Sequence, residues 1–403
     1  MKILIVSQLY YPEQFQINDI APELRRRGHD VTVLTGMPNY PKGELFDGYK
    51  TLEECRAKDA EREAVDGVRI VRCKLRPRKR GKKNLMLNYL SFAYNATRMV
   101  RALDDDFDVV LSYQLSPITM ALPAIAYKRR HGKPLLLYCL DLWPESALAH
   151  VKRSWHLVYK AIAWLSKAIY AKADKILVTS RPFIDYLHER NSVALERLDY
   201  LPQHADTTMV DMDLTAENNG VADFMFAGNL GAGQNLPTII EAAALLGARA
   251  DYKIHFVGDG SQRVELERMT AELGLQDNIF FHGSQRREDM PHYYRMADAL
   301  LITLRGNNAV GNTMPGKLQM YMTTGKPIFG AINGAANEVI QEAQCGECVA
   351  AGDSRGLASI MEKYISAPRA YEACGERARQ YFVSHFTLQH YVDGLEKELK
   401  RLL

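Results

Sequence analysis

This chain contains few cysteines and no long apolar segment. Six cysteines are scattered among 403 residues, which excludes a disulfide scaffold and fits a reducing compartment. Cys345 and Cys348 have CxxC spacing, but no second such pair or histidine pair accompanies them at zinc-ligand spacing. The longest apolar run, 117–127, falls short of the roughly 18 residues of a membrane-spanning helix. We therefore expect neither an integral membrane protein nor a metal or redox centre.

A large charge of one sign is also absent. Lys and Arg number 51 against 48 Asp and Glu, so the net charge of +3 does not indicate a nucleic-acid-binding protein. The first apolar residues, 3–6, are followed by Tyr11-Pro12 without a small-residue cleavage site, so we expect no secretory signal. A chain of 403 residues exceeds the size of one hydrophobic core, which predicts two domains.

Short runs of β-branched residues alternate with helical patterns along the whole chain. This alternation is typical of parallel sheets whose strands are joined by crossover helices. The predicted strands are 2–7, 31–35, 68–73, 109–112, 135–140 and 175–179 in the first half, and 224–227, 253–257, 279–282 and 299–303 in the second. The fold class is therefore α/β, with two doubly wound, Rossmann-like domains facing each other across a cleft.

A polar, acidic stretch, 203–219, separates the two halves, and we place the boundary near residue 205. The first domain then spans 1–205 and the second 206–385, while a helix within 386–403 is expected to pack back on the first domain. Ligands of such domains bind beside the carboxyl ends of the parallel strands. The functional residues should therefore lie on loops that follow strands.

Three predicted strands of the second half end in glycine turns, at 228–231, 258–260 and 281–284. Glycines let backbone N–H groups approach a phosphate. The first turn does not have the G-x-G-x-x-G spacing, and no acidic residue ends the next strand, so a nicotinamide cofactor is disfavoured. Any one turn could be a plain connection, but a parallel sheet aligns the three, which favours a phosphate site.

A polar, glycine-rich loop follows the predicted strand 299–303. Thr313 is expected to cap a helix that starts at Pro315, which would leave backbone N–H groups free. Lys317 then lies in the first turn, where a cation opposes the helix dipole unless it meets an anion. We predict that Lys317 binds a phosphate, although a solvated surface lysine would give the same pattern.

The order of these motifs resembles the donor domain of the GT-B glycosyltransferases of family 4. The pattern runs from the glycine turns through 315–327 to Asn333–Glu338. In the first half, 37–43 and 141–146 resemble the branch of L-fucosamine (N-acetyl-L-fucosamine) transferases of bacterial O-antigen and capsule assembly. The resemblance implies that the second domain holds a UDP-sugar. The residues predicted to hold this donor are Gly228, Asn229, Leu230, Gly231, Gly258, Asp259, Gly260, Arg305, Gly311, Asn312, Thr313, Pro315, Gly316, Lys317 and Gln319.

Two acidic positions of the family differ here. The family commonly has a Glu, seven residues and a second Glu across the donor loop, and the matching residues are Asn312 and Met320. Because the second Glu usually holds the donor ribose, the resemblance leaves that task to Gln319 or to a backbone group. The common Arg and Lys of the first glycine turn correspond to Asn229 and Gln234, which leaves the phosphate charge to Lys317 and Arg305.

The resemblance also implies a retaining transfer without a metal ion, so no cofactor is expected beside the donor substrate. Lys317 and nearby N–H groups would stabilise the charge that develops on the leaving diphosphate. Asp141 is expected to orient the acceptor hydroxyl or to stabilise the oxocarbenium-like sugar, although a helix cap before Pro144 would also explain it. Glu13 either faces the cleft or has a plain surface role.

Seven cations crowd into the ten residues 74–83. An apolar, aromatic helix follows at 85–100, and a second aromatic and basic helix lies at 152–170. This combination suits an anionic membrane surface, at about 1 kcal/mol per basic residue. The alternative is a solvated loop beside two core-facing helices. The residues predicted to face the membrane or the acceptor are Lys79, Arg80, Lys82, Lys83, Trp143 and Glu145.

These features together predict a membrane-peripheral hexosyltransferase at the inner face of the bacterial cytoplasmic membrane. It would move N-acetyl-L-fucosamine or a related hexosamine from a UDP-sugar to a polyprenyl-diphosphate-linked sugar. One alternative is a UDP-sugar epimerase of related two-domain fold, since it needs a similar cleft. Another is a non-catalytic membrane-bound protein that binds nucleotide-sugars, which the missing glutamates allow.

Overall fold

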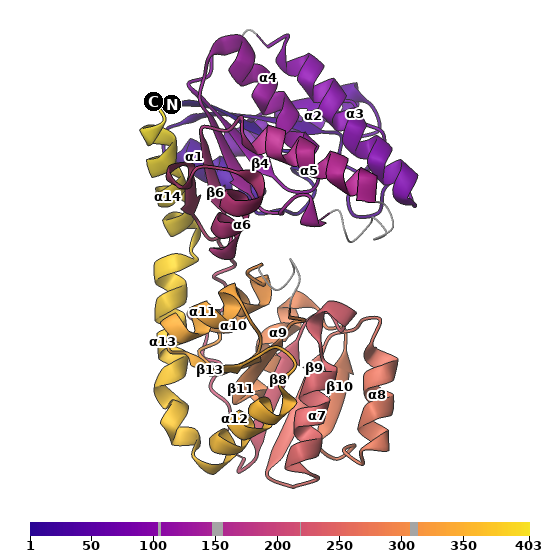
Figure 1. Cartoon of the computed structure of the whole chain (residues 1–403), viewed down its shortest axis with the longest axis vertical. Helices are drawn as coiled ribbons and strands as arrows, with labels where there is room; N and C mark the ends of the chain where they lie inside the picture. The colour runs from indigo at the N-terminus through magenta and orange to yellow at the C-terminus, as the bar shows by residue number, and fades with distance from the viewer. Residues whose placement is uncertain (104–105, 147–155, 218, 307–312) are drawn as a thin grey trace. The chain divides into compact units, whose positions relative to one another are not determined.

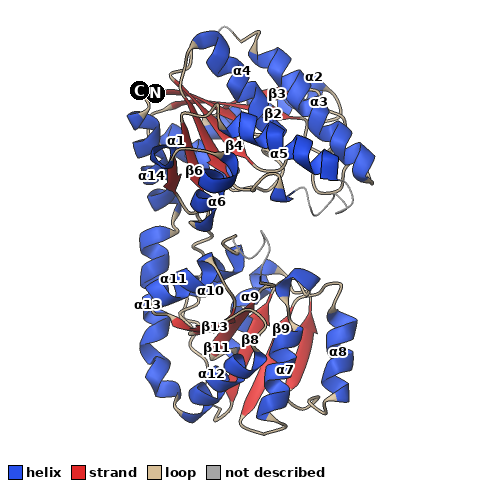
Figure 2. Cartoon of the chain, in the orientation of Figure 1, coloured by secondary structure: helices blue, strands red, loops and turns tan. Residues whose placement is uncertain are grey.

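The computed structural model describes residues 1–103, 106–146, 156–217, 219–306 and 313–403. Contacts divide the chain into two compact units (Figure 1). Unit 1 comprises Met1–Gln203 and Leu388–Leu403, and unit 2 comprises His204–Thr387. Each unit is a parallel sheet with helices on both of its faces (Figure 2). The predicted α/β class with two doubly wound, Rossmann-like domains is confirmed.

Unit 1 contains a seven-stranded sheet of order β3-β2-β1-β4-β5-β6-β7, in which every pair is parallel. Its strands are β1 (Lys2–Val6), β2 (Asp30–Gly36), β3 (Arg69–Cys73), β4 (Val109–Gln114), β5 (Leu135–Cys139), β6 (Lys175–Val178) and β7 (Leu198–Tyr200). Its longer helices are α1 (Ile17–Arg26), α2 (Leu52–Asp66), α3 (Lys82–Val100), α4 (Leu122–His131), α5 (His156–Tyr170), α6 (Pro182–Asn191) and α14 (Leu388–Arg401).

Alternate side chains of each strand serve the two faces of this sheet. Leu4 and Val6 of β1 pack in the cluster that includes side chains of α2 to α6. Ile3 and Ile5 pack in the opposite cluster, with side chains of α1 and α14. Both faces are covered, so the strands are apolar throughout, as expected for a buried parallel sheet.

The last helix of the chain, α14, packs on unit 1 beside α1 (Figure 1). Arg27, which follows α1, forms ion pairs with Asp393 and Glu396. Inside, the rings of Tyr138 and Tyr391 meet edge to face at 5.4 Å between their centroids. The chain therefore returns from unit 2 to complete the core of unit 1.

Unit 2 contains a six-stranded sheet of order β10-β9-β8-β11-β12-β13, again parallel. Its strands are β8 (Ala222–Ala227), β9 (Tyr252–Val257), β10 (Ile279–Gly283), β11 (Ala299–Thr303), β12 (Ile328–Ala331) and β13 (Gly346–Val349). Its helices are α7 (Pro237–Leu246), α8 (Arg263–Glu272), α9 (Met290–Met296), α10 (Gly316–Thr323), α11 (Ala335–Glu342), α12 (Ser354–Ser366) and α13 (Glu372–His385). Side chains of α7, α8 and α12 cover one face, and those of α9, α10, α11 and α13 cover the other.

Candidate active site

The strand order of unit 2 reverses between β8 and β11. From β8 the chain proceeds outward to β9 and β10, and it then returns to place β11 on the other side of β8. The connections after these two strands diverge at the carboxyl edge, which leaves the crevice where doubly wound domains bind their ligands. A ligand site is therefore expected at the loops after β8 and β11.

The three glycine turns come together at this edge, as the sequence predicts. The N–H of Gly228 donates to Val257, and the N–H of Gly258 donates to Gly283, at 2.8 Å each. A Cβ on Gly258 would lie 1.9 Å from the carbonyl oxygen of Gly228, and its φ of +141° is one that other residues rarely adopt. Gly258 is therefore required so that the turns after β8 and β9 can touch.

The amides of these turns are not the free donors that the sequence predicts. Besides Gly228 and Gly258, Leu230 donates its N–H to the carbonyl of Asp259 at 2.9 Å. The N–H of Gly260 donates to the carboxylate of Asp259 at 2.7 Å. The glycines therefore allow the turns to pack closely against one another. Their N–H groups are used in the hydrogen bonds of these turns.

Lys317, the second residue of α10, extends back over the first glycine turn. Its Nζ lies 3.3 Å from the centroid of the Phe226 ring and donates to Oε1 of Gln234 at 2.9 Å. A Cβ on Gly228 would come within 3.2 Å of the same nitrogen. The ammonium group therefore lies directly above the end of β8, at the predicted position for phosphate binding.

No described carboxylate lies within ion-pair distance of Lys317. Burial lowers the pKa of Lys317 to about 6, because the side chain loses water and gains only one amide oxygen and one aromatic face. An incoming anion would supply the missing charge. The solvated surface lysine considered as an alternative does not fit this environment.

Gln234 connects the loops that follow β8 and β11. Its side-chain oxygen accepts from Lys317, while its backbone carbonyl accepts the hydroxyl of Thr303 at 2.6 Å. The neighbouring carbonyl of Gly233 accepts the N–H of Arg305 at 3.1 Å. By its resemblance to the family, Gln234 stands where a cation is common. In the structure it positions Lys317 through the hydrogen bond to its side-chain oxygen.

The start of α10 differs in detail from the prediction. The helix begins at Gly316 with Pro315 in the N-cap position, and no side chain caps it. Thr313 precedes the cap by two residues, so the expected Thr313 cap is wrong, and the reason is that Pro315 takes the extended conformation of an N-cap. The described residues provide no partner for the N–H groups of Gly316 and Lys317, as is usual for the first turn of a helix.

Packing fixes α10 against the end of β8. The Tyr321 hydroxyl accepts the N–H of Ala227 at 2.8 Å. On the next turns Gln319 is 5% exposed, and Met320 packs against the apolar cluster below the sheet. Gln319 is therefore buried and Met320 partly buried, and neither carries a carboxylate.

The remaining predicted donor residues have varied surroundings. Asn229 is exposed, and its amide nitrogen would lie 2.7 Å from a Cβ on Gly231, so the two pack closely at the rim. Arg305 is exposed and makes no ion pair with any described residue. Gly311 and Asn312 lie outside the residues that the structure describes.

In unit 1, Asp141 follows β5 at the carboxyl edge of the sheet. The Ser116 hydroxyl donates to Oδ2 of Asp141 at 2.6 Å and accepts from Nε1 of Trp143 at 3.2 Å. The side-chain amide of Gln114, the last residue of β4, donates to the backbone carbonyl of Asp141 at 3.1 Å. These bonds fix the orientation of the carboxylate, and Ser116 and Gln114 carry no motif by which the sequence could reveal them.

Glu13 is buried, so it does not have the plain surface role that is one of the two predictions. It is 2% exposed, and its carboxylate accepts the N–H groups of Asn39 and Tyr40 at 2.7 Å each and that of Tyr10 at 3.3 Å. Burial raises the pKa of Glu13 to about 7 against the effect of these bonds. A plain surface role is therefore wrong, and the observed contacts hold the backbone of two loops together.

Glu145 is also committed to contacts within unit 1. One of its oxygens accepts the hydroxyls of Tyr159 at 2.9 Å and Tyr186 at 2.7 Å. It therefore ties the segment after β5 to α5 and α6. Trp143, its neighbour in sequence, packs partly buried against the main apolar cluster of the unit.

The basic segment leads into a helix with an exposed apolar stripe. Lys79, Arg80, Lys82 and Lys83 are all exposed, and the last two begin α3. One face of α3 exposes Met86, Leu90 and Tyr94 at 57%, 51% and 62%, and α5 exposes Leu157 and Trp164 at 83% and 73%. Both helices pack against the 3₁₀ turn Ile118–Ala121, so they lie on the same face of the unit 1 sheet (Figure 1). Among the described residues no helix is both long enough and apolar enough to span a bilayer.

Both halves of the chain match models of glycosyltransferase families. The model described as "Glycosyl transferase 4-like domain" matches residues 14–204, and the one described as "Glycosyl transferases group 1" matches 212–381. The "Putative colanic acid biosynthesis glycosyl transferase WcaI" of Escherichia coli (strain K12) is 25% identical over 347 residues, which cover 81% of this chain and 82% of that protein. The N-acetyl-alpha-D-glucosaminyl L-malate synthase of Bacillus anthracis is 26% identical over 158 residues, 39% and 40% of the two chains.

Solved glycosyltransferase structures share the fold. Anabaena HepE in complex with UDP matches with a TM-score of 0.71 at 15% identity, over 100% of both chains. The lipopolysaccharide outer core galactosyltransferase WaaB in its apo form matches with a TM-score of 0.70 at 15% identity, also over 100% of both chains. With each half matched by a glycosyltransferase model and each unit folded as a doubly wound domain, this chain belongs to the glycosyltransferases that have the GT-B fold.

Proposed function

We propose that this protein is a retaining, metal-independent glycosyltransferase of family 4 that transfers a sugar from a UDP-sugar to a lipid-linked acceptor in surface-polysaccharide assembly. Its donor would be UDP-N-acetyl-L-fucosamine or a related hexosamine. Support comes from the relatives, since WcaI is named for colanic acid biosynthesis and WaaB for the lipopolysaccharide outer core. HepE has been solved with UDP and with UDP-glucose, which favours a uridine nucleotide.

The observation that carries the proposal is the Lys317 ammonium at the end of β8. It has no described counter-ion, and it belongs to the first turn of α10, where the N–H groups of Gly316 and Lys317 have no partner among the described residues. N–H donors at a helix N-terminus suit a diphosphate, and the helix dipole has the favourable sign for it. Because the leaving diphosphate gains charge during transfer, the same groups would stabilise the transition state more than the bound donor.

Asp141 is the candidate for the acceptor side of the reaction. Its carboxylate is held by Ser116, and it lies at the carboxyl edge of the unit 1 sheet. A carboxylate in a fixed orientation can position the attacking hydroxyl or stabilise positive charge on the sugar ring. Glu13 has its oxygens occupied by backbone N–H groups, so we assign it to loop positioning and not to proton transfer.

A lipid-linked acceptor requires that unit 1 reach a membrane surface. The exposed stripe on α3 begins with two lysines and includes Arg98, and the exposed face of α5 includes Lys160 and Lys167. Aromatic and aliphatic side chains flanked by cations suit the interface of an anionic bilayer. We therefore propose that these two helices rest on the inner face of the cytoplasmic membrane.

The test is a transfer assay with a set of UDP-sugars and extracted polyprenyl-diphosphate lipids, with the product followed by mass spectrometry. We expect one UDP-hexosamine to give a lipid-linked product of retained anomeric configuration. Lys317→Ala should weaken UDP binding about a hundredfold by calorimetry, whereas the exposed Lys363→Ala should leave the affinity unchanged. Turnover of the UDP-sugar without lipid would indicate an epimerase or hydrolase, and unchanged UDP affinity in Lys317→Ala would contradict the diphosphate site.

A further inference from the structure

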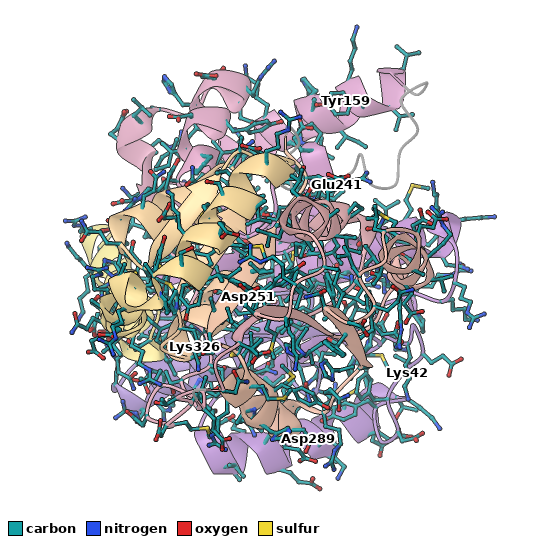
Figure 3. The ribbon with its side chains drawn as sticks, turned by 90° about the horizontal axis from the view of Figure 1, so that it is seen from below. Lys42, Tyr159, Glu241, Asp251, Asp289 and Lys326 are labelled. Atoms are coloured by element: carbon teal, nitrogen blue, oxygen red, sulfur yellow. The ribbon has the colours of Figure 1, made fainter. Side chains whose placement is uncertain are left out.

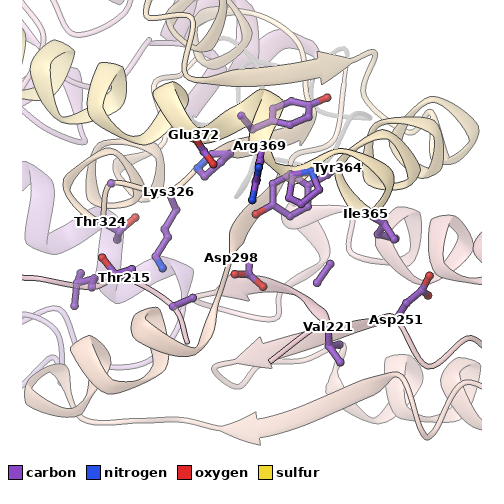
Figure 4. A pocket seen from close by; sticks show the side chains of 18 of the residues that line it. Thr215, Val221, Asp251, Asp298, Thr324, Lys326, Tyr364, Ile365, Arg369 and Glu372 are labelled. Carbon is purple, nitrogen blue, oxygen red and sulfur yellow. The ribbon is translucent and has the colours of Figure 1, made fainter. Parts of the chain in front are cut away.

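A cavity of about 700 Å³ opens at the opposite edge of the unit 2 sheet, where the strands begin (Figure 4). Its lining includes Ala222 at the start of β8, Asp298 before β11 and Lys326 before β12. Tyr364 of α12 and Arg379 of α13 line it from the helical layer. None of these residues contributes to the donor site, which lies at the carboxyl ends of the same strands.

Lys326 brings a nearly buried charge to this cavity, since it is only 5% exposed. In Figure 4 its side chain points into the pocket, between Thr215 and Asp298, and Figure 3 shows its place on unit 2 together with Asp251. No described carboxylate oxygen lies within 4.0 Å of its ammonium, and no described residue hydrogen-bonds it. Burial lowers the pKa of Lys326 to about 8, the direction expected for an ammonium that lacks solvation.

Asp298 shares the cavity but does not neutralise Lys326. One oxygen of Asp298 accepts the backbone N–H of Asp223 at 2.8 Å. Burial raises the pKa of Asp298, which disfavours its charged form. Arg379, Asp213 and Arg295 also act on Lys326, and Glu372 and Arg369 line the same cavity. None of these groups is paired with Lys326.

Arg379 is fixed beside Lys326 by backbone contacts. Its guanidinium donates to the carbonyls of Thr323, Thr324 and Met212, at 3.3, 3.2 and 2.9 Å. A Cβ on Gly325 would lie 2.7 Å from its Cζ, so the guanidinium rests directly on the turn before β12. The two cations therefore come from different elements and are held by rigid parts of the fold.

We propose that this cavity is a second anion-binding site, which takes the phosphate group of a small organic phosphate through Lys326, with Arg379 and the exposed Arg369 beside it. A buried ammonium is costly unless it is paired, and phosphate oxygens are strong acceptors for lysine and arginine. The volume is in the range of small-molecule sites and exceeds the need of phosphate alone. Tyr364 and Ile365 supply an apolar wall for the rest of the ligand. This proposal does not depend on the glycosyltransferase activity.

Inorganic phosphate is the probe for this site. The full chain is first saturated with UDP, which fills the donor site, and phosphate binding is then measured by calorimetry. Wild-type protein should bind phosphate, and Lys326→Met should weaken that binding at least tenfold. Lys363→Met is the matched control, because this exposed lysine of α12 pairs with Glu347 outside the cavity. No binding by the wild type, or equal binding by wild type and Lys326→Met, would overturn the proposal.

A second measurement needs no variant, in case Lys326→Met fails to fold. Reductive methylation of the wild type, followed by peptide mass spectrometry, reports how accessible each lysine is. Phosphate should slow the modification of Lys326 several-fold and leave that of Lys363 unchanged. Equal rates with and without phosphate would exclude an anion in the cavity. Because this readout follows Lys326 alone, it stays valid even if UDP does not bind at Lys317.

Discussion

The carboxyl edges of the two sheets are built in opposite ways. In unit 2 a lysine, Lys317, lies there with no described carboxylate as its counter-ion, and its nitrogen contacts the amide of Gln234 and the ring of Phe226. In unit 1 the carboxylates at the same edge have their hydrogen bonds made, Asp141 by Ser116 and Glu13 by backbone N–H groups. The two edges share one topology, yet the lysine in unit 2 has no described counter-ion, whereas the carboxylates in unit 1 accept hydrogen bonds from neighbouring groups.

This difference between the two edges is consistent with separate roles in nucleotide binding and acceptor positioning. A site that is incomplete without an anion gains binding energy when the anion arrives, which suits the half that captures the nucleotide. A carboxylate whose orientation is fixed in advance loses little entropy when it meets a hydroxyl, which suits the half that positions the acceptor. Changes at the unit 2 site should therefore affect donor binding as well as turnover, and changes at the unit 1 site should affect turnover alone.

The largest expected effect is that of Gly258→Ala, which separates the stacked turns of unit 2. The added Cβ would overlap the carbonyl of Gly228 at 1.9 Å, at a φ of +141°. Strain and overpacking together should lower the free energy of unfolding by about 3 kcal/mol and abolish measurable UDP binding. Urea unfolding and calorimetry measure the two quantities.

Gly233→Ala is the matched control for this change, because a Cβ there meets nothing within 4 Å and the residue needs no positive φ. It should keep both stability and UDP affinity within about 0.5 kcal/mol of the wild type. If the two alanine variants behaved alike, the close contact of the turns would have no bearing on the donor site.

In unit 1, Asp141→Asn should reduce kcat about a thousandfold and leave UDP affinity unchanged, since it removes the charge that we propose to act on the acceptor. Ser116→Ala should reduce kcat about tenfold, because the carboxylate keeps its charge and loses one oriented hydrogen bond. Steady-state kinetics with the lipid acceptor measure both. A loss of UDP affinity in either variant would show that the two halves do not divide the work as described.

Neutralising Lys79, Arg80, Lys82 and Lys83 together should weaken binding to anionic vesicles about a hundredfold. Each cation near the surface contributes up to about 1 kcal/mol, and neighbouring contributions add incompletely. Sedimentation with vesicles measures this partition, and calorimetry should show unchanged UDP affinity. Equal sedimentation of the variant and the wild type would contradict a membrane-facing role for this segment.

A pH dependence of donor binding is also expected in unit 2. The free protein has a Lys317 pKa of about 6, and a bound diphosphate should raise it, so binding above pH 6 takes up a proton. The affinity for UDP-glucose should therefore fall as the pH rises from 6 to 8, by at most tenfold per pH unit. Gln234→Glu places a carboxylate beside the ammonium, which should flatten this profile and weaken binding. A flat profile in the wild type would show that Lys317 is charged before the donor arrives.

Much of this fold could be predicted from the sequence, because the buried strands are β-branched and regularly spaced. β7, β12 and β13 were not predicted: β7 has three residues, and β12 contains Gly330 in place of an apolar side chain. β13 is an edge strand of four residues, Gly346–Val349, and its partly buried side chains give no apolar pattern. Such strands depend on pairing with the neighbouring strands of the sheet, and their own sequences show no clear strand pattern.

Some features of the candidate site could likewise be predicted from the sequence, and others could not. Lys317 could be predicted, since a lysine in the first turn of a helix is unfavourable without an anion. The occupied amides of Gly228 and Gly258 could not, because their partners belong to neighbouring strands whose order the sequence does not give. The contacts of Ser116 and Gln234 depend on tertiary packing and follow from no local spacing.

The most direct test of the account is a crystal structure of the protein with UDP. We predict that a diphosphate oxygen lies 2.7–3.1 Å from the Nζ of Lys317, the usual distance of a charge-assisted hydrogen bond, with Gln234 still on the same nitrogen. The N–H groups of Gly316 and Lys317 should face the same phosphate. A structure in which UDP binds elsewhere, while Lys317 contacts only Gln234 and Phe226, would contradict the account.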